Sequence, residues 1–170
     1  MDFQVPSQLE TDRILLRQFE ENDWQDLHKY YSDPVATKYT TGQEFTEEQT
    51  WRNVSMMIGH WQLRGYGPYA AVEKKSQKVM GAIGFWYPLG WPSPEIMWSL
   101  SSDYWGKGYA SEATRKVQKT GSQYLPHISL ISFIHPDNSA SINLAEAVGA
   151  QFEKTESFRG KQWPIYRHPK

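Results

Sequence analysis

Three strand-length segments that follow one another without an intervening helix constrain the fold of this chain most. They are YAAVEKK (residues 69–75), VMGAIGFWY (residues 79–87) and EIMWSL (residues 95–100), all rich in apolar, aromatic or β-branched residues. A turn at Ser76 and Gln77 joins the first two, and a proline-rich loop joins the last two. Strands joined by connections this short pair with opposite directions, so this part of the chain predicts an antiparallel meander.

The segment before the meander has the spacing of a helix. Thr46 followed by Gln49 has the pattern of a capping box, and Gly65 is a typical helix stop. Apolar residues recur between them at intervals of three and four, which predicts a buried face made of Trp51, Val54, Ile58 and Trp61. Asn22 and Gln25 repeat the capping pattern upstream and predict a shorter helix, whose apolar face holds Trp24, Leu27 and Tyr31.

The remaining segments alternate between strands and helices. RILLRQF (residues 13–19) predicts a strand near the start, and HISLISFI (residues 127–134) predicts a buried strand near the end. A helix is predicted after Gly108, with one face made of Ala110, Ala113, Val117 and Tyr124. A short helix over residues 139–149 and two final strands around residues 152–158 and 163–167 complete the chain. The predicted order β-α-α-β-β-β-α-β-α-β-β indicates a mixed α+β protein.

Length and composition indicate one folded unit. The 170 residues suit a single domain, predicted over residues 1–170, and the apolar fraction of 39% is enough for a substantial core. The longest apolar stretches, such as IGFWY, are far below the roughly 18 residues that suggest a membrane span. The N-terminus has neither a basic region nor an apolar one, so we expect a cytoplasmic protein that does not insert into membranes.

The absence of cysteine limits the chemistry of this protein. A chain without Cys forms no disulfide or thiolate metal site, and it cannot carry an acyl group on a Cys nucleophile. The five His residues show no HxxxH or HExxH spacing, so no metal site is expected. The net charge of −1, with Lys and Arg scattered along the chain, argues against nucleic-acid binding but leaves room for a small anion site.

The stretch WGKG places two glycines, Gly106 and Gly108, between a predicted strand and a predicted helix. The first turn of a helix has N–H groups without intrahelical partners and binds phosphate readily. Glycines let the backbone turn such groups inward and remove the β-carbons that would hold a ligand away. An ordinary strand-to-helix connection has the same appearance, and the stretch lacks both the third glycine of a dinucleotide turn and the GK[ST] ending of a P-loop.

Several further motifs occur in a fixed order around these glycines. EIMWSLSSDYWGKGYASEA followed by HPDNSASINLAEAVGAQFE resembles the GNAT superfamily of acyl-CoA N-acyltransferases, and its RimJ/RimL-like branch in particular. LETDRILLRQFEENDW and HWQLRGYGPYAAVEKK resemble the same branch, so the likeness extends from about Leu9 to at least Phe152. The resemblance implies a mostly antiparallel mixed sheet of about seven strands with splayed central strands, flanked by about four helices.

The resemblance also implies acetyl-CoA as the acyl donor and no metal. The family's pyrophosphate loop has the form [QR]xxGx[GA], which starts here at Asp103, a departure from Gln or Arg. In the family the pantetheine arm pairs with the strand before this loop, where Leu100 would be the oxyanion donor. The implied CoA-binding residues are Trp98, Ser99, Leu100, Gly106, Lys107, Gly108, Tyr109, Ala110, Ser111 and Asn138.

For catalysis the resemblance implies direct attack by an amine, which fits a chain without Cys. Glu95 matches an acid that could deprotonate the amine, although a strand-end carboxylate in an ion pair has the same sequence appearance. NSASINLAEAVGA resembles the family's NxxSxxLxxxxGF, and Ala145 stands where a tyrosine acid is usual. Ser141 is then the remaining candidate to donate a hydrogen bond to the departing thiolate, while Asn138 also suits a helix N-cap.

The acceptor stays open at this level. RimJ/RimL-like relatives acetylate protein N-termini, but the branch also includes enzymes for small-molecule amines, and a homodimer is left open too. Aromatic residues that could line an acceptor pocket are Tyr39, Trp51, Tyr66, Trp86 and Trp91. The missing tyrosine and Asp103 also allow a catalytically inactive acyl-CoA-binding module, and a purely structural domain is a third alternative.

Overall fold

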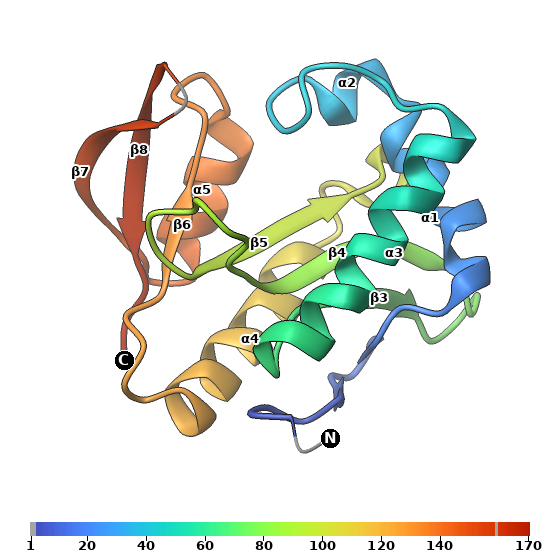
Figure 1. Cartoon of the computed structure of the whole chain (residues 1–170), viewed down its shortest axis with the longest axis horizontal. Coiled ribbons are helices and arrows are strands. Elements are labelled where there is room, and N and C mark those ends of the chain that lie inside the picture. Colours follow the sequence, from blue (N-terminus) through green and yellow to red (C-terminus); the bar gives the residue numbers. More distant parts are fainter. Residues whose placement is uncertain (1–2, 159) are drawn as a thin grey trace.

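The computed structural model describes residues 3–158 and 160–170, and in this part of the chain all strands join one sheet (Figure 1). The strand order is β1-β2-β3-β4-β5-β6-β8-β7. The strands are β1 (Gln8–Glu10), β2 (Ile14–Arg17), β3 (Pro68–Glu73), β4 (Val79–Trp86), β5 (Glu95–Leu100), β6 (Ile131–Phe133), β7 (Gln151–Phe158) and β8 (Lys161–Arg167). The helices are α1 (Trp24–Tyr31), α2 (Pro34–Thr37), α3 (Glu47–Arg64), α4 (Tyr109–Tyr124) and α5 (Ser139–Ala147), with 3-10 turns η1 (Glu21–Asp23) and η2 (Ser102–Tyr104).

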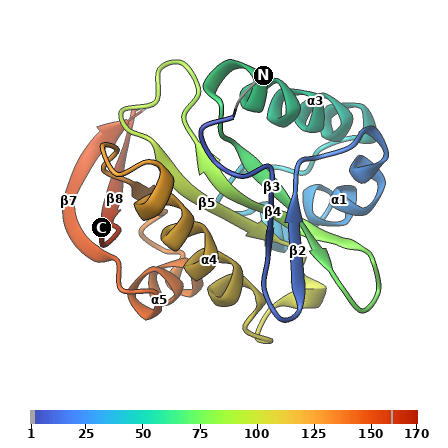
Figure 2. The same ribbon diagram turned by 90° about the horizontal axis from the view of Figure 1, so that it is seen from below.

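The helices cover both faces of the sheet. Figure 2 shows α1 and α3 on one face and α4 on the other. Successive side chains of a strand point to opposite faces, and the burial follows this rule. In β3, Ala70 and Val72 join a buried cluster with α1 and α3, whereas Tyr69 and Ala71 join a second cluster that includes residues of α4. The central strands are therefore buried on both faces.

The predicted meander is confirmed. β3 pairs antiparallel with β4. β4 pairs antiparallel with the whole length of β5, from Trp86 opposite Glu95 to Gly81 opposite Leu100. β5 and β6 are parallel, and their paired register is limited to Glu95 opposite Ile131. Beyond this point the two strands diverge (Figure 1), which confirms the splayed central strands that the resemblance implied.

The predicted mixed α+β class and its mostly antiparallel sheet are confirmed. The described residues also form two short elements that were not predicted, β1 and α2. α3 begins with the predicted capping box: Gln49 N–H donates to Thr46 Oγ1, and Thr46 N–H donates to the Gln49 side chain. It ends at Gly65 in the left-handed conformation, as expected for a glycine stop.

Several local predictions are wrong. The capping box before α1 uses Glu20 and Asp23 instead of Asn22 and Gln25, because the Asp23 carboxylate accepts the Glu20 N–H and is also held by Arg17. The strand predicted over residues 127–134 is reduced to β6, since the chain turns before it.

Two aromatic residues assigned to apolar helix faces are exposed. Val54 and Trp61 are buried as predicted, but Trp51 is 44% exposed, because the buried face of α3 is turned toward Thr50 and Met57. Tyr124, at the end of α4, is 43% exposed. No helix in the described part of the chain is both long and apolar enough to cross a membrane.

Candidate active site

The gap between β5 and β6 presents backbone groups that no neighbouring strand uses. Ser132 Oγ donates to Ile96 O at 2.6 Å, and Trp105 Nε1 donates to Leu100 O at 2.8 Å, so both carbonyls point away from β4. The N–H and C=O of one strand residue point to the same side, and alternate residues repeat that direction. The N–H groups of Trp98 and Leu100 therefore point into the gap, past the point where β5 and β6 pair.

Ser99 differs from its two neighbours. Its backbone faces β4, opposite Ala82, so its N–H is directed toward the sheet and away from the gap. Its side chain nevertheless lines both cavities described below. Of the three strand residues that the sequence singled out, Trp98 and Leu100 therefore direct their backbone N–H groups into the gap, and Ser99 does not.

The glycine turn lies at the wide end of this gap, directly after η2. Gly106 has φ = 70° and Gly108 has φ = 80°, a left-handed conformation that glycine adopts without strain. Gly108 is the N-cap of α4. Within the described part of the chain, the backbone N–H groups of residues 106–111 have no hydrogen-bond acceptor. This cluster of free donors at a helix N-terminus is suited to an anion.

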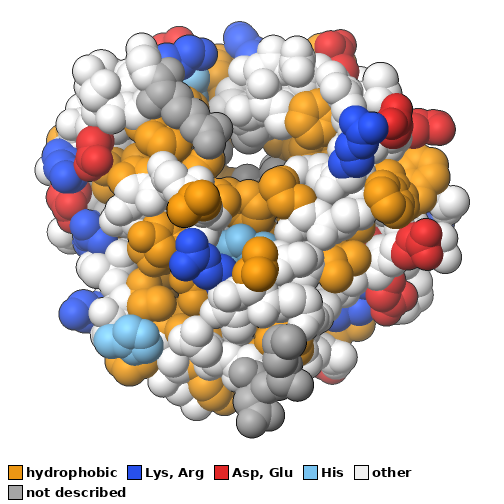
Figure 3. Space-filling model, viewed as in Figure 1, with side chains coloured by type: hydrophobic (Ala, Val, Ile, Leu, Met, Phe, Trp, Pro, Cys, Tyr) orange, Lys and Arg blue, Asp and Glu red, His pale blue; other side chains and the backbone are white. Residues whose placement is uncertain are grey.

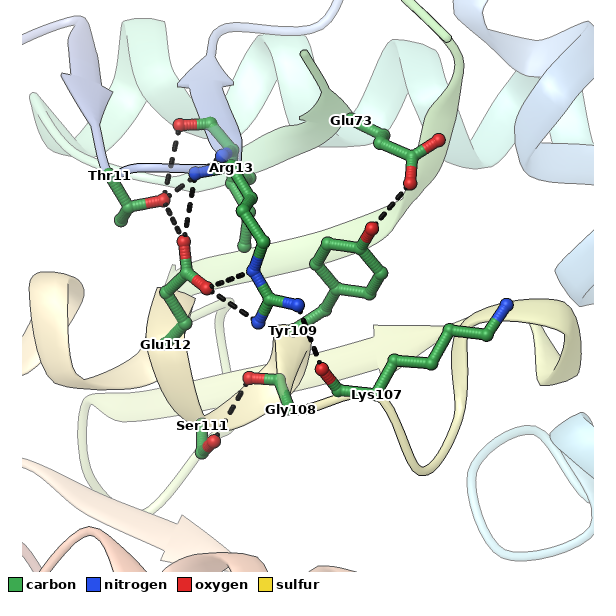
Figure 4. A network of polar contacts seen from close by, with 9 residues as sticks. Thr11, Arg13, Glu73, Lys107, Gly108, Tyr109, Ser111 and Glu112 are labelled. Carbon is green, nitrogen blue, oxygen red and sulfur yellow. Dashed lines mark hydrogen bonds and ion pairs between the residues drawn. The ribbon is translucent and has the colours of Figure 1, made fainter. Parts of the chain in front are cut away.

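A set of polar contacts behind the turn fixes its position (Figure 4). Arg13 Nη1 donates to Lys107 O at 2.9 Å, and the same guanidinium lies 2.6 Å from Glu112 and 4.3 Å from the centre of the Tyr109 ring. Thr11 Oγ1 donates to Glu112 at 2.6 Å. The first turn of α4 and the turn before it are therefore braced from the loop between β1 and β2.

Polar side chains near the turn make hydrogen bonds to other parts of the protein. Lys107 Nζ donates to the Asp103 carbonyl at 2.7 Å, so it folds back over its own loop. Arg115 Nη2 donates to Ala147 O at 2.7 Å and caps the end of α5. Tyr109 donates its hydroxyl to Glu73. An anion bound at this turn would therefore meet backbone groups more than charged side chains.

A cavity of about 540 Å³ connects the glycine turn with β5 and α5. Lys107 does not line it, in agreement with its bond to Asp103. The cavity brings together the other predicted CoA-binding residues, namely Trp98, Ser99, Leu100, Gly106, Gly108, Tyr109, Ala110, Ser111 and Asn138, and Ser141 lines it as well.

One wall of this cavity was not predicted. It is formed by α2 and the following loop, including Val35, Lys38 and Tyr39. Asp33 caps α2 by accepting the Val35 N–H at 2.8 Å, and its other oxygen accepts the Ser102 hydroxyl at 2.7 Å. This double contact holds α2 against η2, next to the glycine turn. The Asp-Pro pair at residues 33 and 34 is a helix-start signal that could have revealed it.

A second cavity, of about 280 Å³, lies on the other side of the gap and contains Glu95. The Glu95 side chain is almost fully buried, accepting Trp91 Nε1–H at 3.0 Å and the Phe133 N–H at 3.3 Å. Burial raises the pKa of Glu95 to about 8, because both partners are neutral and do not offset the loss of solvent around the charge. A carboxyl group with a pKa near neutrality can exchange a proton with an amine.

Ser141 lies where the two cavities meet. Its Oγ accepts a hydrogen bond from Trp98 Nε1 at 3.1 Å, which leaves its own proton free to be donated. Its N–H donates to Asn138 Oδ1 at 3.1 Å, so Asn138 is the N-cap of α5. Both functions foreseen for Asn138 are compatible, because it caps the helix and also lines both cavities.

A buried chain of hydrogen bonds braces the gap from behind. Gln118 Nε2 donates to His168 Nδ1 at 2.7 Å, and His168 Nε2 then donates to Ser132 Oγ at 2.8 Å, which donates to Ile96 O. Burial lowers the pKa of His168 to about 4, so the ring is neutral at pH 7 and can accept on one nitrogen and donate from the other. These residues come from α4, β6 and the C-terminal end, and no local pattern connects them in the sequence.

The aromatic residues suggested for an acceptor pocket divide into two groups. Tyr39, Trp86 and Trp91 line the cavity that contains Glu95. Trp51 is on the exposed side of α3, and Tyr66 is buried in the core, so neither belongs to the site. Among the described residues, no group of three or more His, Asp or Glu side chains is arranged to hold a metal ion.

Comparisons with known proteins agree with this geometry. A family model described as an acetyltransferase (GNAT) domain matches residues 13–151. The chain is 33% identical over 147 residues to the uncharacterised N-acetyltransferase p20 of Bacillus licheniformis, a match that covers 85% of this chain and 83% of that protein.

Solved structures share the fold. An acetyltransferase (GNAT family) from Bacillus anthracis has a TM-score of 0.79 at 28% identity, and the match covers 94% of this chain and 95% of that one. A putative ribosomal-protein-serine acetyltransferase from Vibrio cholerae has a TM-score of 0.76, with the same two coverages; its identity of 17% shows the fold alone. Since the family model spans most of the sequence, the chain belongs to the GNAT family of acetyltransferases.

Proposed function

We propose that this protein is an acetyl-CoA-dependent N-acetyltransferase that transfers an acetyl group to a primary amine by direct attack in a ternary complex. The observation that carries the proposal is the pair of cavities that meet at the splay of β5 from β6. One ends at the free N–H groups of the glycine turn and the other contains Glu95, and Ser141 lines both.

The larger cavity has the groups needed to hold the acyl donor. The N–H groups of residues 106–111 would bind the pyrophosphate, with the helix N-terminus adding a favourable dipole. The N–H groups of Trp98 and Leu100 would bind the pantetheine arm as an added strand. Lys107 has a smaller role here than the family pattern implies, because it is bonded to Asp103 O.

The residues at the junction can complete the transfer when acetyl-CoA supplies the acetyl group. The amine nitrogen forms a bond to the acetyl carbon, and the carbon–sulfur bond breaks. Glu95, as its carboxylate, accepts a proton from the amine directly or through water. Leu100 N–H stabilises the negative charge that develops on the carbonyl oxygen, and Ser141 donates a hydrogen bond to the thiolate. The thiolate takes a proton from water to give the thiol, and Glu95 returns the amine proton to water.

The amine acceptor belongs to one of two classes under this proposal, a protein N-terminus or a small molecule. The Vibrio cholerae protein is described as a putative ribosomal-protein-serine acetyltransferase, and the motifs of this chain resemble the RimJ/RimL-like branch. The relative from Bacillus licheniformis is described as an N-acetyltransferase, which favours an amine acceptor. The shape and chemistry of the smaller cavity bear on which class of amine is used.

Two measurements test the proposal together. Isothermal titration with acetyl-CoA should show one site per chain, and a panel of peptides, polyamines and antibiotic amines should give free thiol with at least one acceptor. Binding without turnover on any acceptor would instead support an inactive acyl-CoA-binding module. No binding of acetyl-CoA would support a purely structural domain.

A further inference from the structure

The cavity around Glu95 is lined mainly by aromatic rings that come from separate parts of the chain. Trp91 belongs to the loop before β5, Phe133 to β6 and Phe158 to the end of β7. Trp91 meets Phe158 edge to face at 5.0 Å between ring centres, and Phe133 stacks on Phe158 at 5.8 Å. These three residues, the inner cluster, surround a carboxyl group to which Trp91 and Phe133 both donate.

A second set of rings lines the same cavity. The Tyr39 ring, from the loop after α2, lies 5.0 Å from His135, which follows β6. His135 in turn meets Trp163 of β8 edge to face at 5.9 Å. Figure 3 shows hydrophobic side chains gathered around a hollow between α2 and the β7–β8 hairpin. The Tyr39–His135 contact joins the loop after α2 to the segment after β6, and the Tyr39, His135 and Trp163 residues all line the cavity.

These walls define the ligand that fits. Aromatic faces attract an ammonium group and also pack against flat apolar groups. Among the described residues that line the cavity, Glu95 is the one carboxyl group. A ligand carboxylate next to Glu95 in this poorly solvated space would oppose the ionisation of Glu95, which must be charged to accept the amine proton. A volume of about 280 Å³ is also at the lower end for small-molecule pockets.

We propose that the acceptor is a small monoamine with a flat apolar body and no carboxylate group. Its amine would lie at Glu95, near the junction with the larger cavity, and its apolar body would pack against the inner cluster. This inference rests on the proposed function and narrows it, because it selects small molecules over protein N-termini. Polyamines fit less well, since each additional ammonium group would lose water without a second carboxylate to pair with.

The first experiment compares four probes in a thiol-release assay with saturating acetyl-CoA. Phenethylamine and phenylalanine differ by a single carboxylate, spermidine adds further cations, and a tetrapeptide that begins with alanine represents a protein N-terminus. We expect kcat/KM for phenethylamine to exceed that for phenylalanine by at least about 100-fold. We expect it to exceed the values for spermidine and the peptide by at least about tenfold.

The second experiment uses a matched pair of variants on the same strand. Phe158→Leu removes a ring from the inner cluster, whereas Phe152→Leu changes a ring that is 58% exposed on β7 and lies outside both cavities. We expect Phe158→Leu to raise the KM for phenethylamine about fivefold and to leave the KM for acetyl-CoA unchanged, with no effect from Phe152→Leu. Phe133→Leu serves the same purpose if Phe158→Leu does not fold.

The outcomes distinguish the choice of acceptor from the proposed acetyltransferase activity. Equal or faster turnover of phenylalanine, spermidine or the peptide overturns the inference about the acceptor and leaves the proposed function intact. Equal effects of the Phe158 and Phe152 changes also overturn it. Calorimetric binding of acetyl-CoA with no turnover of any probe overturns the inference and counts against the proposed function as well.

Discussion

The two cavities that share the splayed strands are built in opposite ways. The larger one ends at a short continuous stretch, in which backbone N–H groups lack hydrogen-bond acceptors among the described residues, and side chains such as Arg13 and Glu112 only brace the turn from behind. The smaller one consists of side chains from distant segments, with a buried acid among aromatic rings. A backbone site tolerates changes of neighbouring side chains, whereas a side-chain site depends on each residue that forms it.

The difference also concerns charge. The glycine turn lies at the surface, where an anion can exchange its water for backbone donors at little cost. Glu95 lies in a poorly solvated environment, and its neutral partners leave its charged form destabilised. The pH dependence of stability and activity should therefore come mainly from the smaller cavity.

The pH dependence of stability should show the destabilised acid directly. The pKa of Glu95 is about 8 in the folded protein and 4.5 as the ordinary value, so between these pH values the folded state holds a proton that the unfolded state has lost. Stability from this group is fully present below pH 4.5 and is lost as the pH rises through 8. From pH 5 to pH 9, the free energy of unfolding of the wild type should fall by about 4 kcal/mol relative to that of Glu95→Gln, as measured by urea unfolding. A constant difference across this range would contradict the burial argument.

The same substitution should separate the two cavities in catalysis. Glu95→Gln cannot accept a proton, so we expect kcat to fall about 100-fold at pH 8. The Kd for acetyl-CoA, measured by calorimetry, should stay within about twofold, because Glu95 does not line the larger cavity. Glu153→Gln, which changes a surface carboxylate paired with Arg167, is the matched control and should retain full activity. An unchanged kcat in Glu95→Gln would remove this residue from the mechanism.

A change at the glycine turn should have the reverse effect. Gly108→Ala places a β-carbon at a residue with φ = 80°, so the backbone must twist and its N–H groups lose their common direction. We expect the Kd for acetyl-CoA to rise at least about tenfold. Gly149→Ala carries the same backbone strain at φ = 84°, after α5 and outside both cavities, and should leave this Kd unchanged. Equal losses in the two variants would mean that stability, and not the ligand site, had been affected.

The junction between the cavities should give the smallest effect. Trp98→Phe removes the N–H that holds Ser141 Oγ and keeps most of the ring, and Ser141→Ala removes the hydroxyl itself. Each variant should lower kcat about fivefold, a typical effect for one hydrogen bond. The double variant should lose little more than either single variant, because Trp98 acts through Ser141. Additive losses in kcat would show that the two residues act independently.

The contrast between the cavities also explains what the sequence could predict. The glycine turn, α4 and the cap of α5 are local features, so Gly106, Gly108 and Asn138 could be recognised from neighbouring residues and from the family resemblance. The meander was equally accessible, because short connections leave few alternatives to antiparallel pairing. Among the other local features, the residues predicted to cap the start of α1 were wrong only in detail.

The smaller cavity was only partly predictable, for a physical reason. Helical periodicity placed Trp51 on the buried face of α3, but the register that packs best exposes it and buries Thr50 in its place. Phe133, Phe158 and Trp163 are unremarkable strand residues in the sequence, and only the tertiary fold brings their rings together in the cavity that contains Glu95. The link from Trp98 to Ser141 joins residues 43 positions apart, which no local pattern reveals.

Hydrogen–deuterium exchange with and without acetyl-CoA tests the central claim most directly, because it reports on the backbone N–H groups themselves. Peptides that cover residues 96–111 should exchange more slowly when acetyl-CoA is bound, through the free N–H groups of the glycine turn and those of Trp98 and Leu100. Peptides from β1 and from the first half of α3 should be unchanged. Protection that is absent from residues 96–111, or that falls mainly elsewhere, would contradict the placement of acetyl-CoA between the splayed strands.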